Sequence, residues 1–228
     1  MTTDPPLRRP KQARSQRTLE QILDAAEQLL EGRTFESISV AELVREAGTS
    51  VGAFYTRFRD KDALLPALYE RYDRWVAGRA ARTRAARPWA SLDFDATAAW
   101  VAGEIITLFR HRRYLLRAMT LFARLRPEKV DDATRLGRQQ QLSFLREALL
   151  AHRATITHPD PERAADHTVF MAAAVCREAV LFRDAPHAKT HGMTFAELHQ
   201  ELTRFITHYL TGARPSRRPR RSPRPEPS

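Results

Sequence analysis

Ser50 lies in the run Gly48-Thr49-Ser50-Val51-Gly52, which has the form G-x-S-x-G. In α/β-hydrolases, a serine in this pattern occupies a sharp turn between a strand and a helix, where its hydroxyl is an exposed nucleophile. The preceding residues, 40–47, repeat apolar side chains with a helical period, so they predict a helix where a hydrolase needs a strand. We therefore expect no enzyme and no catalytic residue, and a hydrolase built on Ser50 is an alternative to be tested.

Residue patterns typical of a metal site are few. His187 and His191 are four residues apart, but they lie in a predicted loop between Pro186 and Gly192. The single cysteine, Cys176, excludes an intramolecular disulfide and a cysteine-rich zinc site, and we expect it to be a small buried side chain. The patterns G-x-x-x-x-G-K-[ST], G-x-G-x-x-G and H-E-x-x-H do not occur. We expect no metal site and no cofactor.

A tight turn at Gly48 separates two short predicted helices, 40–47 and 51–57. Two short helices joined by a glycine turn are typical of a helix-turn-helix, whose second helix enters the major groove of DNA. Phe54 would anchor the second helix to the core, whereas Arg57 could donate two hydrogen bonds to a guanine. The spacing alone leaves two alternatives open, DNA binding and a structural turn inside a helical bundle.

Helices must position these side chains, because the apolar residues repeat with a helical period along the chain. No alternating β-branched run bounded by hairpin turns competes with this pattern. The sequence therefore predicts an all-α fold of about nine helices. The predicted helices span residues 16–31, 40–47, 51–57, 61–84, 94–110, 113–126, 128–152, 161–184 and 195–211.

Residue types at the helix ends agree with this assignment. Residues 39–42 and 194–197 have the pattern of a capping box, in which a serine or threonine and a glutamate satisfy each other's backbone N–H groups. Gly48 and Gly212 stand where a left-handed residue would end a helix. Pro66, inside the fourth predicted helix, removes a backbone donor and predicts a kink.

Several short runs near the N-terminus form a longer pattern. These runs are Ile22-Leu23-Asp24-Ala25-Ala26, Ser39-Val40-Ala41-Glu42-Leu43, Ala47-Gly48-Thr49-Ser50-Val51-Gly52-Ala53-Phe54-Tyr55-Thr56-Arg57-Phe58 and Lys61-Asp62-Ala63-Leu64. Together they resemble the N-terminal region of TetR-type regulators, with its ILxAA, S-V-x-x-[IL], A-G-V-S-x-G-x-[LF]-Y-x-x-F and K-x-x-L segments. The departures are Thr49, where valine is usual, and Pro66. The resemblance covers only the first third of the chain.

This resemblance implies a three-helix DNA-binding head on a larger C-terminal helical bundle. The residues expected to contact DNA or to hold the helices that do so are Arg14, Arg17, Ser39, Ser50, Val51, Gly52, Ala53, Tyr55, Thr56, Arg57 and Lys61. Tyr55 and Lys61 match phosphate contacts of the family, and Ser39 lies where a phosphate meets a helix N-terminus. Arg57 is the one side chain of this set that suits a bidentate contact with guanine.

The resemblance also implies a ligand pocket in the C-terminal part and a homodimer formed through helices 161–184 and 195–211. Small residues at 172–174 and an apolar stripe that includes Leu198 and Leu202 suit such an interface, and they also suit packing within one chain. An effector is expected to be small and largely apolar. Its candidate contacts are Trp100, Phe109, Tyr114, Phe122, Phe144 and Phe170, although aromatic residues at helical spacing are also typical of a plain core.

The net charge of +11 is unevenly distributed. Residues 1–60 hold nine basic and nine acidic groups, whereas residues 212–228 hold six arginines and one glutamate among prolines. The predicted domains are a disordered basic arm at 1–14, a helix-turn-helix domain at 15–62 (the motif itself at about 39–58), a ligand-binding and dimerisation domain at 63–211, and a disordered tail at 212–228. A basic cluster, Arg110-His-Arg-Arg113 with Arg117, suits solvated arginines or, alternatively, an anionic effector.

The function expected from these features is that of a ligand-responsive transcriptional regulator. It would bind double-stranded DNA at a pseudo-palindromic operator as a homodimer, most simply as a repressor that a small effector releases. The alternative is a constitutive DNA-binding regulator without an effector. Because no apolar run approaches the roughly 20 residues that span a bilayer, we expect a bacterial cytoplasmic protein without membrane contact.

Overall fold

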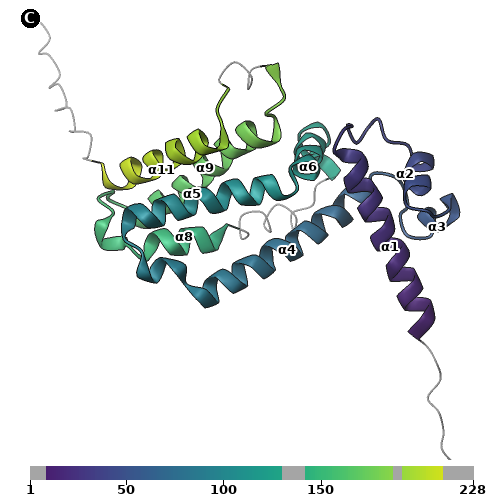
Figure 1. Ribbon diagram of the computed structural model, residues 1–228, viewed down its shortest axis with the longest axis horizontal. Coiled ribbons are helices and arrows are strands. Elements are labelled where there is room, and N and C mark those ends of the chain that lie inside the picture. Colours follow the sequence, from purple (N-terminus) through teal and green to yellow (C-terminus); the bar gives the residue numbers. More distant parts are fainter. Residues whose placement is uncertain (1–8, 130–141, 187–191, 213–228) are drawn as a thin grey trace, which may run out of the picture.

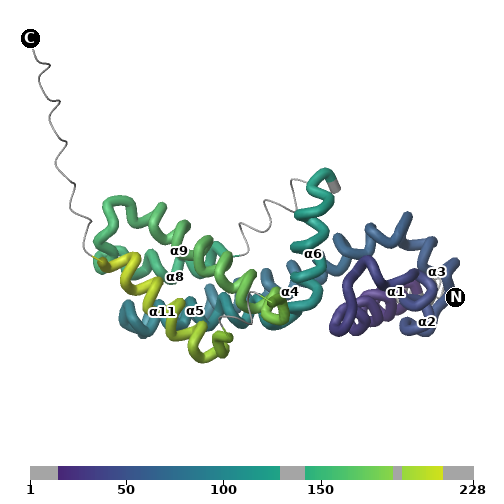
Figure 2. The backbone as a smooth tube through the Cα atoms, turned by 90° about the horizontal axis from the view of Figure 1, so that it is seen from above, coloured from purple at the N-terminus to yellow at the C-terminus, as the bar shows by residue number. Residues whose placement is uncertain are grey.

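The computed structural model describes residues 9–129, 142–186 and 192–212, and its regular elements in these ranges are helices. Nine of them are α-helices, which confirms the predicted all-α fold. A small head of three helices lies at one end of an elongated molecule, and a larger bundle, the body, lies at the other (Figure 1). Figure 2 shows the same separation from above, with α6 at the side of the body that faces the head.

The head consists of α1 (Arg9–Leu30), α2 (Val40–Glu46) and α3 (Val51–Tyr55). Its core is formed by the apolar stripe of α1 and by residues of α2 and α3 that are almost fully buried, among them Ile22, Leu23, Leu43 and Phe54. Helix α1 begins at Arg9, within the segment predicted as a disordered arm, so the helix starts earlier than its apolar stripe indicates.

The body is built from six longer helices and several single turns. The helices are α4 (Leu64–Ala86), α5 (Phe94–His111), α6 (Arg113–Leu125), α8 (Ser143–Leu150), α9 (Pro161–Cys176) and α11 (Phe195–Thr211). The single turns are Pro88–Ser91, Pro127–Lys129 and Arg153–Thr155, and a π-helical turn at Arg177–Leu181 follows α9. Helix α11 packs along α5, and α8 and α9 pack against each other and against α5.

Several predicted helices have other bounds in the structure, among them 128–152, whose described part holds a single turn ending at Lys129 and α8 at Ser143–Leu150. Helix α4 begins at Leu64, so Pro66 is the third residue of its first turn. The backbone N–H groups of a first turn have no partner within the helix, and a proline there breaks no hydrogen bond. The predicted kink at Pro66 is therefore wrong. Likewise, α9 ends at Cys176 and gives way to the π-helical turn, where one continuous helix to 184 was predicted.

The predicted helix ends can be compared with the observed caps. Both capping boxes are present, at Ser39 and at Thr194, and Gly48 has the expected left-handed φ of 61°. Gly212 has a φ of −68° and an extended conformation, so the left-handed cap predicted there is wrong. Residues 1–8 and 213–228, which include most of the predicted arm and tail, and the pair His187 and His191 lie outside the described residues.

The stripes expected at a dimer interface are largely used within the chain. Ala172 and Ala173 of α9 are 0% and 6% exposed, and Leu198 and Leu202 of α11 are 2% and 3% exposed. These four side chains pack in the core of their own body and do not reach a surface. The large apolar side chains that α9 leaves exposed are a different pair, Phe170 at 67% and Val175 at 46%.

Candidate nucleic-acid interface

The turn between α2 and α3 depends on its glycine. Gly48 adopts a left-handed conformation, which costs little for a residue without a Cβ. Its N–H donates to the carbonyl of Arg45 at 3.2 Å, and the N–H of Thr49 donates to the carbonyl of Val44 at 2.9 Å. These bonds satisfy the last carbonyls of α2 and turn the chain sharply into α3.

Helix α3 is held in place by a cap at its N-terminus and by a buried aromatic side chain near its C-terminus. The Ser50 hydroxyl accepts a hydrogen bond from the N–H of Ala53 at 3.1 Å and so caps the helix. Phe54 is fully buried, and its ring lies 5.1 Å from that of Phe58. Ser50 follows helix α2, and its hydroxyl serves as a cap, so the strand-to-helix elbow of a hydrolase is absent at this position.

The outer side of α3 is exposed and has little charge. Val51 and Tyr55 are 45% and 53% exposed. Gly52 lies between them, and a Cβ added there would meet only the Ser50 hydroxyl, at 4.0 Å. The Thr56 hydroxyl donates back to the carbonyl of Gly52 at 2.8 Å. This side of α3 therefore offers a methyl-rich surface with one phenol.

Arg57 was expected to reach a guanine, but its guanidinium is engaged within the head. It donates to the carbonyl of Ser15 at 3.1 Å and to the hydroxyl of the same residue at 3.2 Å. A further bond, 2.8 Å long, goes to the carbonyl of Ala53. Arg57 thus ties the end of α3 to the first turns of α1, and contact with a base would require these bonds to break.

Lys61 is engaged in the same way. Its ammonium group donates to the carbonyls of Phe35, Glu36 and Ile38 at 2.9, 3.2 and 2.9 Å, which uses all three of its N–H donors. The same group lies 4.7 Å from the centre of the Phe35 ring. Lys61 therefore closes the loop between α1 and α2, and in this structure it offers no donor to a phosphate.

The polar groups of Ser39 are also engaged in hydrogen bonds within the head. Its N–H and its hydroxyl both donate to a carboxylate oxygen of Glu42, at 2.9 and 2.7 Å. Arg33 donates to the other oxygen of that carboxylate at 2.7 Å. These hydrogen bonds, first from Arg33 and then from Ser39, lower the pKa of Glu42 from 4.5 to about 2. The start of α2 therefore already carries a fixed negative charge where a phosphate was expected.

Arg17 is the predicted cationic side chain that remains exposed on α1. Arg14 lies on the same helix, one turn earlier. Because Arg57 binds the backbone of Ser15, this part of α1 lies beside α3. Arg17 of α1 and Val51 and Tyr55 of α3 are exposed, and we refer to these three residues together as the outer face of the head.

A group of ion pairs between head and body did not emerge from the sequence. Arg71 of α4 pairs with Asp24 and, at 3.7 and 3.5 Å, with Glu20 and Glu27 of α1. Arg112, at the junction of α5 and α6, also pairs with Glu27. The three acids recur along one face of α1, which is a visible signal. Their partner lies more than 40 residues away, so the sequence cannot reveal it.

The aromatic residues proposed to contact an effector do not gather around one cavity. Phe144 is fully buried and Phe122 nearly so, whereas Phe170 is 67% exposed. Trp100 packs edge-on against Phe144, with ring centres 6.4 Å apart. Tyr114 lines a cavity between head and body, and only Phe109 lines the cavity inside the body. In the cavities described here, these six candidate contacts therefore do not share one lining.

Other classes of site find no support in the part of the chain that the structure describes. Within residues 9–129, 142–186 and 192–212, no three histidine, cysteine, aspartate or glutamate side chains lie close enough to hold a metal ion. Burial raises the pKa of the Cys176 thiol to about 12, so the group is protonated at neutral pH. None of the described helices is long and apolar enough to cross a membrane.

Comparison with known proteins agrees with this arrangement. Residues 22–68 match the family described as bacterial regulatory proteins, tetR family. A segment of 51 residues is 39% identical to the uncharacterized HTH-type transcriptional regulator YvdT of Bacillus subtilis, and it spans 22% of this chain and 26% of that protein. The chain thus matches about a quarter of the length of this curated relative.

Solved structures are similar over most of the chain. A tetR-family transcriptional regulator from Streptomyces coelicolor superposes with a TM-score of 0.59 at 18% identity, over 84% of this chain and 79% of that one. The regulator FadR of Bacillus subtilis, in complex with stearoyl-CoA, superposes with a TM-score of 0.53 at 15% identity, over 82% and 97%. At these identities, the likeness concerns the fold.

Proposed function

We propose that this chain, whose residues 22–68 match the tetR family and whose fold resembles that of such regulators, is a transcriptional regulator, most simply a repressor, which binds a pseudo-palindromic operator as a homodimer. The observation that carries this proposal is the outer face of the head. Helix α3 is anchored by a fully buried Phe54 and a glycine turn, yet it keeps Val51 and Tyr55 exposed. Such a helix is suited to enter a major groove, with apolar contacts to thymine methyls.

We further propose that a small, largely apolar effector binds in the body and releases the protein from DNA. A cavity of about 140 Å³ lies between α4, α5, α6 and the π-helical turn, with Tyr69, Phe109 and Met119 among its walls. The Tyr72 hydroxyl, which belongs to the lining, donates to the carbonyl of Leu108 and is therefore already satisfied. Most of the other lining side chains are apolar. An effector in this cavity would touch α4, which leads directly into the head (Figure 1). The stearoyl-CoA complex of FadR shows that one protein of this fold takes a ligand.

The homodimer is proposed to form through α9, but through a narrower surface than the sequence suggested. Phe170 and Val175 are exposed on this helix, and the stacked rings of Phe205 and Tyr209, 5.7 Å apart, lie half-buried on α11. Two heads would read two half-sites, which is why such operators are pseudo-palindromic. Changing Phe170 to Glu should give a monomer in sedimentation equilibrium. If this variant remains a dimer, the interface lies elsewhere.

An operator shift assay tests the central proposal. The DNA upstream of the protein's own gene is searched for a pseudo-palindrome, and its binding is measured with and without a panel of small apolar compounds. Binding that a compound reverses supports the proposal, whereas binding that no compound alters favours the constitutive regulator. Absence of specific binding would contradict both. A hydrolase assay on the wild type and Ser50→Ala addresses the remaining alternative, and equal activity of the two excludes it.

A further inference from the structure

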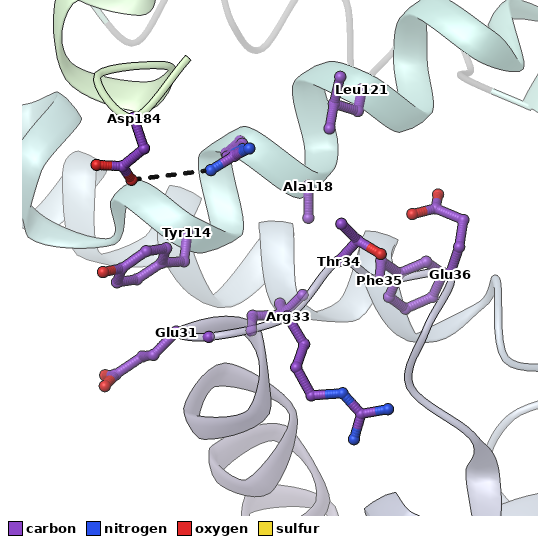
Figure 3. A pocket seen from close by; sticks show the side chains of 12 residues that line it. Glu31, Arg33, Thr34, Phe35, Glu36, Tyr114, Ala118, Leu121 and Asp184 are labelled. Atoms are coloured by element: carbon purple, nitrogen blue, oxygen red, sulfur yellow. Dashed lines mark ion pairs between the residues drawn. The ribbon is translucent and has the colours of Figure 1, made fainter. Parts of the chain in front are cut away.

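A second cavity, of about 220 Å³, lies between the head and the body. One wall is the end of α1 and the loop after it, residues 30–36, and the other wall is α6 together with Asp184 (Figure 3). We refer to it as the junction cavity. It shares no lining residue with the cavity inside the body, so an occupant of one would leave the other open.

The junction cavity has an apolar floor. Leu30, Phe35 and Ala118 are between 3% and 7% exposed and face it from head and body, and Leu121 adds a fourth apolar side chain. An apolar cavity of about 150 Å³ is large enough to hold benzene in another protein. The junction cavity therefore has room for a single ring, or an aliphatic chain of similar size, and one polar group.

The polar end of the cavity is lined by Arg117 and Asp184, and Arg113, which lies outside the lining and donates to the Tyr114 hydroxyl at 2.7 Å, completes an imperfect ion-pair arrangement with them. The Asp184 carboxylate lies 3.4 Å from a guanidinium nitrogen of Arg113 and 4.0 Å from one of Arg117. The dashed line in Figure 3 marks the pair of Asp184 with Arg117. A well-formed pair of this kind has an N···O distance of about 2.8 Å. Asp184 is also 57% exposed, so it holds both arginines loosely. A carboxylate from outside, placed between the same two arginines, could approach them more closely.

The head side of the cavity restricts the charge of an occupant. Glu31 and Glu36 belong to its lining and are exposed, whereas the Arg33 guanidinium turns away from it toward Glu42 (Figure 3). A dianion would meet these two carboxylates at close range and be repelled. A single negative charge at the far end, between Arg113 and Arg117, avoids them. The occupant should therefore be a monoanion with an apolar body.

We propose that the junction cavity binds a small monocarboxylate, whose apolar part covers the floor and whose carboxylate takes the place of Asp184 between Arg113 and Arg117. The bound molecule touches both the 30–36 loop of the head and α6 of the body. It therefore favours the arrangement of head and body seen here over any in which the two separate. The binding itself does not depend on the proposed function, but its consequence for DNA does.

Benzoate is a suitable probe, and calorimetric titration of the full chain measures its binding without DNA. Arg117→Gln should weaken binding about tenfold or more, because a charge-assisted hydrogen bond is lost. Asp184→Asn should tighten it severalfold, because the internal competitor is removed. Arg124→Gln is a matched control on the same helix, where the arginine pairs with Glu178 outside the cavity, and it should leave the affinity unchanged. Benzamide, which is neutral, should bind at least tenfold more weakly than benzoate.

The opposite responses to the first two changes distinguish a carboxylate site from a general effect on folding, and circular dichroism of each variant checks that the helices are intact. Unchanged or weaker binding by Asp184→Asn overturns the proposal, as does unchanged binding by Arg117→Gln. If Ala173→Leu, which fills the cavity inside the body, abolishes benzoate binding instead, the site is the effector cavity. If benzoate does not bind as proposed but the operator shift assay shows specific DNA binding, the proposed function still holds.

Discussion

The outer face of the head differs from the residues that hold the head together, Arg57 and Lys61, which we call the base of the head. The two groups use their polar side chains in different ways. On the outer face, Arg17 and Tyr55 point into solvent. At the base, Arg57 and Lys61 spend their donors on backbone carbonyls of α1 and of the loop after it. All four residues were expected to contact DNA. The contrast indicates that a cationic side chain at a position predicted to contact DNA can instead hold the proposed DNA-binding surface in place.

The strongest test of this contrast is Lys61→Met. The change leaves three carbonyls without their charged donor, so we expect the free energy of unfolding to fall by about 2 kcal/mol. Thermal and urea unfolding followed by circular dichroism measure the loss. If stability is unchanged and only operator affinity falls, Lys61 is a phosphate contact, and the base of the head is part of the DNA surface after all.

Tyr55→Ala should have the reverse signature. The side chain is 53% exposed, so stability should change little, whereas operator affinity should fall about tenfold, equivalent to about 1.4 kcal/mol. Tyr55→Phe should show a smaller loss that is uniform across DNA sequences, as expected for a phosphate contact. Fluorescence anisotropy on operator and scrambled DNA gives both values. Leu125→Ala, at a side chain of the body that is 71% exposed, is the control and should bind like the wild type.

Arg57→Ala separates two interpretations of one side chain. If its bonds to Ser15 and Ala53 persist on DNA, the variant should lose about 1 kcal/mol of stability and bind every operator variant more weakly by the same factor. The sequence-based expectation is different, namely a relaxed preference at one base pair. Binding to a set of single-base operator variants decides between them, because a change at one position alone would show that Arg57 reads a base.

Replacing Glu42 should have the smallest effect of the four changes, and this effect, on the free energy of unfolding, should depend on pH. Its folded pKa of about 2 lies below the ordinary 4.5, so its contribution to stability is present above pH 4.5 and is lost as the pH falls toward 2. Glu42→Gln should therefore be less stable than the wild type at pH 7 and equally stable near pH 2. An NMR titration of the Glu42 carboxyl group that gives a midpoint near 4.5 would contradict this account.

Local signals explain which parts of the structure the sequence could predict. The helical period, the capping box at Ser39 and the glycine at Gly48 each depend on residues within a few positions, and they correctly located the helix-turn-helix. The hydrogen bonds from Arg57 to Ser15 and from Lys61 to Phe35 join residues more than 20 positions apart. The residue types show that these side chains are hydrogen-bond donors, but they do not identify the acceptors. The π-helical turn at Arg177–Leu181 changes hydrogen bonding without a breaker residue, and so it left no signal.

The last turn of α11 is joined to the loop before α9. The N–H of Thr157 donates to the carbonyl of Leu210 at 2.9 Å, and its hydroxyl donates to that of Gly212 at 2.9 Å. This end of α11 lies at the side of the body opposite to the head (Figure 1), whereas Ser15 in the first turns of α1 lies beside α3. A fluorescent label attached at Gly212 should therefore leave DNA binding intact. The same label attached at Ser15 should obstruct it.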